Sequence, residues 1–142
     1  MANRPSRAQT LTTNNKKIEF FSDFMTSFAK TPIGNQLAKI TNDRSINQSL
    51  KNIILTDIGE RLFQPNIGCE INALLFENYD YSNISTLEYY ISKSIKTNEA
   101  RVNLLDIEIE STNDFELTIN IYYNTINNPE KILFTYILKR VR

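Results

Sequence analysis

The apolar residues change their period once along the chain, near Thr97, and this change is the strongest constraint on the fold. Before it they recur every three or four positions, as on one face of a helix; after it they alternate with polar residues, as on a half-buried strand. Helical patterns followed by strand patterns are typical of the α+β class. The sequence therefore predicts N-terminal helices packed on a C-terminal three-stranded antiparallel β-meander.

The first helical pattern follows Ser45 and has a clear apolar stripe. Either Asp43 or Ser45 is suited to be its N-cap, because short polar side chains accept hydrogen bonds from the first free backbone N–H groups. Gly59 is a natural end, since glycine adopts the left-handed conformation that often follows a helix. The stripe consists of Ile46, Leu50, Ile53 and Ile54.

Two further helices are expected before the change of period. A short one runs from about Glu70 to Tyr79 and includes Leu74 and Leu75. A longer one begins after Asn83 or Ser85, because Ser85 and Glu88 have the spacing of a capping box. Its apolar face consists of Leu87, Tyr90, Ile91 and Ile95.

Three strands are expected after the change of period. The alternation is clear over residues 105–109 and 117–123, and a third segment covers residues 132–138. Asn113–Asp114 and residues 127–130 are rich in turn-forming Asn, Asp and Pro and separate the three segments. Short connections of this kind join neighbouring antiparallel strands, so a meander follows.

The chain length suits one hydrophobic core, with an N-terminal arm in front of it. Residues 1–17 are mostly polar and are expected to form a flexible arm, leaving residues 18–142 as a single domain. The segment Phe20–Phe28 is dense in aromatic residues and allows two interpretations. It packs as a strand or loop on the domain's own core, or it anchors a partner subunit, since aromatic residues are enriched at the centres of interfaces.

Composition excludes several classes of function. Lys plus Arg (16) equals Asp plus Glu (16), so the formal net charge is +0 and no overall field favours nucleic acid or a membrane surface. The single Cys69 excludes an internal disulfide and a multi-cysteine metal site, which points to the cytosol. No long apolar run of membrane-helix type is present. No cofactor is expected.

The residues of common catalytic sites are also missing. The chain has no His, the commonest general base and metal ligand. Gly34–Lys39 lacks the second glycine of a phosphate-binding loop, and Cys69 is interpreted as a small buried apolar residue. A lytic glycosidase stays open as an alternative, but no spacing selects a pair of carboxylates, so we expect no enzyme. The candidates by residue type are Glu60, Glu70, Glu77 and Glu99.

The stretch from Gln48 to Glu77 carries a recognisable motif. Its parts are Gln48–Thr56, Gly59–Arg61, Phe63–Pro65, Ile67–Cys69 and Leu75–Glu77. With these residues the chain resembles the GpW/gene 25-like baseplate wedge family, which includes the TssE component of type VI secretion baseplates. A weaker resemblance extends from about Phe20 to Arg142. The motif loop that we single out contains Gly59, Glu60, Arg61, Phe63, Pro65 and Gly68.

The resemblance implies a structural subunit of a contractile phage tail, assembled in the host cytoplasm and located in the virion baseplate. Its implied partners are the tail sheath protein and other baseplate wedge proteins, with six copies in a sixfold baseplate. A type VI secretion origin is the alternative that the sequence leaves open. Within the motif loop, Glu60 and Arg61 either hold the loop internally, which we favour, or contact other wedge proteins.

The resemblance also implies a role in starting the sheath. The family's Glu-Pro-Arg triplet, associated with sheath assembly, corresponds here to Glu99-Ala100-Arg101, with the proline replaced. Glu99 and Arg101 either face a neighbouring subunit or form a solvated or intramolecular pair. The last strand, with its neighbour, would offer an open edge to the first sheath ring. Cationic residues at its rim would attract an acidic sheath tail: Lys139, Arg140 and Arg142.

Overall fold

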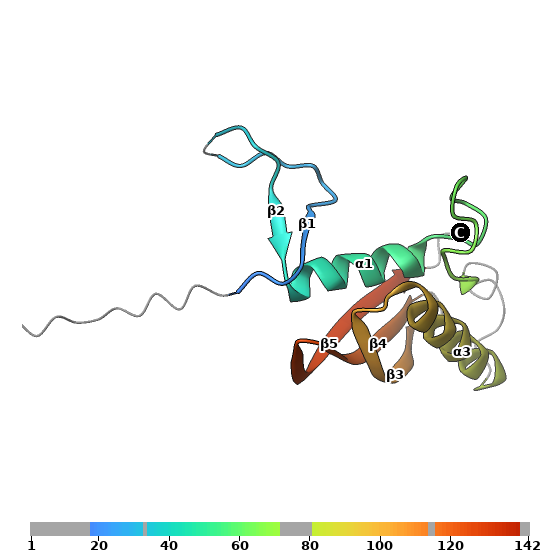
Figure 1. Ribbon diagram of the computed structural model, residues 1–142. Helices are drawn as coiled ribbons and strands as arrows, with labels where there is room; N and C mark the ends of the chain where they lie inside the picture. Colours follow the sequence, from blue (N-terminus) through green and yellow to red (C-terminus); the bar gives the residue numbers. More distant parts are fainter. Residues whose placement is uncertain (1–17, 33, 72–80, 114–115, 140–142) are drawn as a thin grey trace, which may run out of the picture.

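The computed structural model describes residues 18–32, 34–71, 81–113 and 116–139. Helices α1 and α3 pack on one face of a three-stranded antiparallel sheet, and the β1–β2 hairpin projects from the beginning of α1 away from that sheet (Figure 1). The α+β class is confirmed. The predicted order is wrong in part, because a hairpin precedes α1 and α3 lies in the middle of the chain. The elements are β1 (Ser22–Phe24), β2 (Lys39–Thr41), α1 (Asp43–Leu55), α3 (Tyr81–Asn98), β3 (Val102–Asn113), β4 (Glu116–Thr125) and β5 (Asn128–Lys139).

Helix α1 buries the predicted stripe, but both of its ends differ from the prediction. Its N-cap is Asn42, so the suggested caps Asp43 and Ser45 both lie inside the helix. The Asn42 side chain makes no capping bond because it is bonded to the backbone before β1. At the other end Thr56 is the C-cap and its N–H donates to the Asn52 carbonyl, so the helix ends before Gly59.

Helix α3 presents Leu87, Ile91 and Ile95 to the core, as predicted. It already includes Tyr81, so the predicted beginning after Asn83 or Ser85 is wrong and the capping-box spacing is a coincidence inside the helix. Leu74, Leu75 and Tyr79 of the expected short helix lie outside the described residues.

The sheet has β4 at its centre, in the order β3-β4-β5. Every second residue of β4 is buried, which confirms the predicted alternation. In the β3–β4 hairpin Asn113 pairs with Glu116; Asp114 of the predicted turn lies outside the described residues. In the second hairpin Thr125 pairs with Asn128, so the turn is shorter than predicted and Pro129 belongs to β5. An edge strand tolerates this proline because one side of its backbone has no partner.

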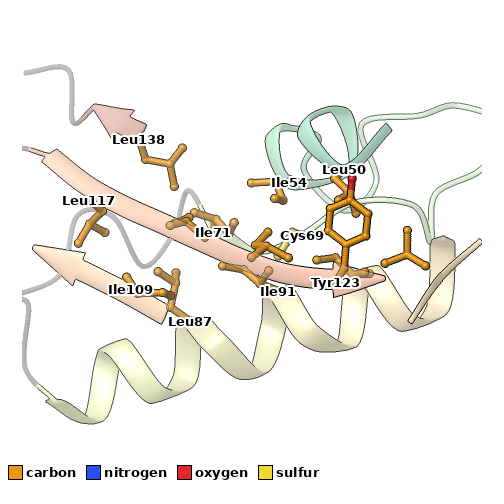
Figure 2. Packing of buried hydrophobic residues seen from close by; sticks show 14 of the residues in the cluster. Leu50, Ile54, Cys69, Ile71, Leu87, Ile91, Ile109, Leu117, Tyr123 and Leu138 are labelled. Carbon is orange, nitrogen blue, oxygen red and sulfur yellow. The ribbon is translucent and has the colours of Figure 1, made fainter. Parts of the chain in front are cut away.

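A single core joins the two helices to the inner face of the sheet (Figure 2). Tyr123, at its centre, is fully buried and donates a hydrogen bond from its hydroxyl to Asn47 Oδ1 at 2.6 Å. Burial raises the pKa of this hydroxyl, with the charges of Asp43 and Glu99 adding to the effect. The core therefore fixes α1 against β4, and so fixes the position of everything attached to α1.

Candidate interaction surfaces

The junction between α3 and β3 holds the Glu99–Arg101 pair. Arg101 Nε and Nη2 each lie 2.6 Å from a carboxylate oxygen of Glu99, and Ser49 of α1 donates a further hydrogen bond. Burial raises the pKa of Glu99, but the hydrogen bonds from Arg101 and Ser49 outweigh it and leave that pKa below its ordinary value. The carboxylate is thus charged and engaged inside the molecule.

Arg101 is the accessible member of this pair. Glu99 is 4% exposed, whereas the Arg101 side chain is 35% exposed. Its guanidinium carbon lies 5.4 Å from the centre of the Phe21 ring, within the range of a cation–π interaction. The structure shows an intramolecular pair with Arg101 half-buried beside the hairpin, and a contact of Arg101 with a neighbouring subunit stays a prediction.

The motif loop, residues 57–69, connects the end of α1 to the core and is closed by its own backbone. Gly59 N–H donates to the Pro65 carbonyl at 2.9 Å, and Cys69 N–H donates to the Thr56 carbonyl at 2.8 Å. Glu60 accepts a hydrogen bond from Asp57 N–H at 3.1 Å. These bonds agree with the internal role that the sequence favours for Glu60.

Gly68 lets the end of this loop pass directly over the end of α1. A β-carbon at this position would lie 2.5 Å from the Thr56 carbonyl oxygen and 2.8 Å from the Asp57 carbonyl carbon, and φ is +143°. The Gly68 carbonyl accepts a hydrogen bond from Ser94 of α3. Only glycine fits here.

The tip of the loop is apolar and faces solvent. Phe63 is 97% exposed and Leu62 is 91% exposed. Arg61 beside them is also exposed. The sequence motif includes Phe63 but misses Leu62, although two large apolar residues in a loop without helical or strand periodicity were a usable signal.

The N-terminal hairpin carries a second apolar surface. Phe20, Phe24 and Phe28 are 56%, 58% and 68% exposed. Packing on the domain's own core, one of the two interpretations, is therefore wrong for these three rings, while Phe21 does pack against the core.

Two amide side chains fasten this hairpin to α1. Asn42 Oδ1 accepts from Phe20 N–H at 2.9 Å, and Gln48 Nε2 donates to the Phe24 carbonyl at 2.8 Å. Gln48 Oε1 also accepts from Thr26 N–H at 3.0 Å. Since these bonds reach the hairpin backbone, its position is set while its rings stay outside.

The third surface is the edge strand β5. Leu133 and Ile137 lie on its outer face, 51% and 50% exposed. Lys139 at its end pairs with Glu116 of β4 at 2.9 Å and keeps 69% of its side chain exposed. Arg140 and Arg142 lie outside the described residues.

The opposite edge, β3, has a different character. Its outer face carries Asp106, Glu108 and Glu110, and its pairing with β4 has two register shifts. Bulges and charges of this kind discourage strand addition. The ladder between β4 and β5 is regular from residue 132 onward, so the two edges are not equivalent.

The described residues offer little for catalysis. Among them there is no group of three or more His, Cys, Asp or Glu side chains placed to hold a metal. Burial raises the pKa of Cys69 to about 12, which keeps it a thiol. Of the glycosidase candidates, Glu77 lies outside the described part of the chain and Glu70 is exposed. No described helix is long and apolar enough to cross a membrane.

The matching family model and the matching curated relative carry the same protein description. The family model described as baseplate wedge protein gp25 matches residues 41–130. Baseplate wedge protein gp25 of Enterobacteria phage T4 is 34% identical over 90 residues, which cover 63% of this chain and 68% of the phage T4 protein.

Solved structures share the fold at low sequence identity. A Geobacter sulfurreducens protein described as a tail lysozyme has a TM-score of 0.66 and 21% identity, covering 72% of this chain and 96% of that one. A chain of the anti-feeding prophage baseplate has a TM-score of 0.59 and 16% identity over 86% of this chain and 87% of that one. A chain of the postcontracted pyocin R2 baseplate has a TM-score of 0.50 and 13% identity, covering 80% and 98%.

Proposed function

The chain belongs to the family of baseplate wedge protein gp25, and from this premise we propose that it helps to start the tail sheath by offering a β-sheet edge to the first sheath ring. As a family member it is a baseplate wedge protein of a contractile tail, located in the virion baseplate. The observation that carries the finer proposal is that β5 is an edge strand of the described sheet, with a regular ladder to β4 from residue 132 onward.

The β5 edge has the properties that strand addition requires. Among the described strands, none pairs with β5 on the side away from β4, and β5 is long enough, at 12 residues, to pair with an extended segment. Leu133 and Ile137 on its outer face would give an added strand apolar neighbours. The acidic side chains and register shifts of β3 would disfavour strand addition at that opposite edge of the sheet.

Cationic residues at the end of β5 would orient the incoming chain. Lys139 is largely exposed despite its pairing with Glu116, and Arg140 and Arg142 follow it in the sequence. Such charges raise association rates with an acidic segment more than they raise final affinity. An acidic tail of the sheath protein is therefore the proposed ligand.

Arg101 is proposed as a contact to a neighbouring subunit, with Glu99 as the residue that positions it. Glu99 holds the guanidinium by two charge-assisted bonds, which fixes its direction. The exposed part of Arg101, next to Phe21, would meet the neighbour. The aromatic rings of the hairpin would meet other wedge proteins, in six copies around the baseplate.

We also propose that the protein is not an enzyme, although one structural relative is described as a tail lysozyme. That likeness concerns the fold, and a fold alone does not carry an activity. A general acid needs a raised pKa, whereas hydrogen bonds lower the pKa of Glu99. Purified protein should leave the turbidity of a peptidoglycan suspension unchanged; steady clearing that survives repurification would overturn this point.

The β5 edge is tested with a matched pair of lysine variants. Ile137→Lys places a charge on the β5 edge at a residue that is 50% exposed, and Leu105→Lys does the same on β3 at 51%. Baseplates containing each protein are mixed with purified sheath protein, and sheath formation is followed by negative-stain microscopy. Ile137→Lys should reduce nucleation at least about 10-fold, since edge charges block strand pairing, while Leu105→Lys should behave as wild type. Equal nucleation by both variants would sink the β5 assignment.

A further inference from the structure

The tip of the motif loop combines a fixed backbone with two almost fully exposed apolar side chains. Phe63 and Leu62 are the most exposed large apolar residues of the described chain. Holding a Phe and a Leu outward on an ordered loop does not stabilise a folded protein in water. Such a pair is typical of an anchor that becomes buried in a partner.

We propose that Arg61, Leu62 and Phe63 form a plug that enters an apolar socket, with carboxylates at its mouth, on another protein of the baseplate. The proposal rests on the proposed function only because it takes the partner from the baseplate. It assigns a contact separate from the β5 edge and from the Glu99–Arg101 junction.

The rigidity of the loop argues for a preformed plug. Gly59 N–H, Glu60 N–H and Gln64 N–H each donate to carbonyls within the loop, at 2.9, 3.1 and 3.2 Å. Gly68 is packed on the backbone of Thr56 and Asp57, which closes the base. Because the backbone is already ordered, burying the two side chains costs only their own rotamer freedom.

Charge at the tip indicates the chemistry of the socket. The Glu60 carboxylate accepts the Asp57 N–H and so is used to close the base of the loop. Arg61 is exposed next to Leu62 and Phe63. An apolar socket with acidic groups at its rim would complement both the rings and this cation.

The position of the loop favours a partner other than the one that meets the hairpin. The loop lies at the C-terminal end of α1, whereas the hairpin projects at its N-terminal end (Figure 1). Leu55 and Ile58 beside the base are 41% and 51% exposed and would extend the apolar contact. The molecule thus offers separate apolar contacts at the two ends of one rigid helix, as a subunit that bridges neighbours would need.

The first experiment compares polar variants of exposed residues. The protein is co-expressed with the other baseplate wedge proteins of its own virion, and wedge complexes are purified and quantified. Leu62→Ser/Phe63→Ser should weaken incorporation at least about 30-fold, the loss typical of an interface anchor. Ile126→Ser, a matched control at 66% exposure in the β4–β5 turn, should incorporate normally. Both proteins should keep the wild-type unfolding temperature.

A second experiment identifies the socket. A photoreactive benzoylphenylalanine replaces Phe63, and the cross-linked peptide within the purified wedge is sequenced. A cross-link to an apolar pocket with Asp or Glu at its mouth supports the proposal, as does loss of incorporation in Arg61→Glu.

Three results would overturn the plug. One is normal incorporation of the double serine variant; another is a cross-link to a second copy of this chain; the third is a cross-link to a polar or basic surface. Different results would contradict the proposed function: the wild-type protein enters no wedge complex, or Ile137→Lys leaves sheath nucleation unchanged.

Discussion

At the scale of single residues, two glycines of the motif loop differ in what a methyl group would meet. At Gly68 an added β-carbon would lie 2.5 Å from the Thr56 carbonyl oxygen, whereas at Gly59 it would meet nothing within 4 Å. Gly68→Ala should lower the free energy of unfolding by about 3 kcal/mol or more, because overlap adds to backbone strain. Gly59→Ala, with φ of +90°, should cost only about 1 kcal/mol. Urea denaturation of both variants checks this, and equal losses would contradict it.

Glu99 makes a second residue-scale prediction, on pH. Its pKa is lowered in the folded protein from an ordinary value of 4.5, so its contribution to stability is present above about pH 4.5 and is lost as the pH falls through the lower folded-state pKa. Glu99→Gln should cost about 1–3 kcal/mol at neutral pH, because Arg101 loses its charged partner while solvent screens part of the loss. The difference from wild type should shrink in acid.

The control for this prediction is a surface pair. Glu116→Gln breaks the exposed pair with Lys139 and should cost less than about 1 kcal/mol at neutral pH. Urea midpoints of the three proteins, measured from neutral to acidic pH, test the comparison. A Glu99→Gln deficit that stays constant in acid would contradict the charged pair.

The role of a side chain was predictable where neighbouring residues in the sequence determine it. It was not predictable where contacts with residues distant in the sequence determine it. The sequence groups Glu60, Pro65 and Gly68 in one motif loop, and in the structure backbone hydrogen bonds and the packing of Gly68 close this loop. It did not identify Asn42 as the N-cap of α1, because the side chain of Asn42 is directed by backbone groups more than twenty residues earlier. Nor could it choose between the two roles of Glu99, since the Ser49 hydroxyl that binds this carboxylate comes from another helix.

At the scale of elements, the β1–β2 hairpin depends on α1. Its strands have three residues each and none of these residues is buried, and an isolated two-stranded hairpin is only marginally stable in water. The bonds from Gln48 to Phe24 and Thr26 must therefore contribute to its order.

Gln48→Ala should loosen the hairpin without unfolding the domain. Amide hydrogen exchange should accelerate in peptides from residues 18–41, while the global free energy of unfolding changes by less than about 1 kcal/mol. Gln64→Ala, at an exposed glutamine in the motif loop, is the control and should leave exchange in the hairpin unchanged. Unaltered exchange in Gln48→Ala would show that the hairpin holds its position by other contacts.

Elements with strong periodicity were predictable, and those without it were not. The alternation over residues 117–123 predicts β4, and the buried positions match. The hairpin has no amphipathic pattern because it has no buried face, so its strands gave no signal apart from their aromatic residues. The turn over residues 127–130 was placed too late because Asn128 and Pro129 are typical turn residues but here open the edge strand β5.

At the scale of the whole molecule, the described residues form exposed apolar surfaces on a chain with no net charge. They are the hairpin rings, the tip of the motif loop and the outer face of β5. Neighbouring subunits would cover such surfaces in an assembly, but a free monomer has no charge repulsion to keep copies apart. The balanced charge composition therefore favours association.

Self-association of the isolated protein should consequently be strongest near its isoelectric point of about 6.3. Sedimentation velocity at that pH should show larger species with rising concentration, and these should diminish at about pH 4.5, where partial protonation of the Asp and Glu carboxylates leaves net positive charge that separates the molecules. If the β5 edge is the main contact, Leu133→Lys/Ile137→Lys should remove most of the larger species, because edge lysines oppose strand pairing. The control Leu105→Lys adds positive charge to the β3 edge and should retain more of them. Equal loss in both variants would mean that net charge, and not a particular edge, governs association.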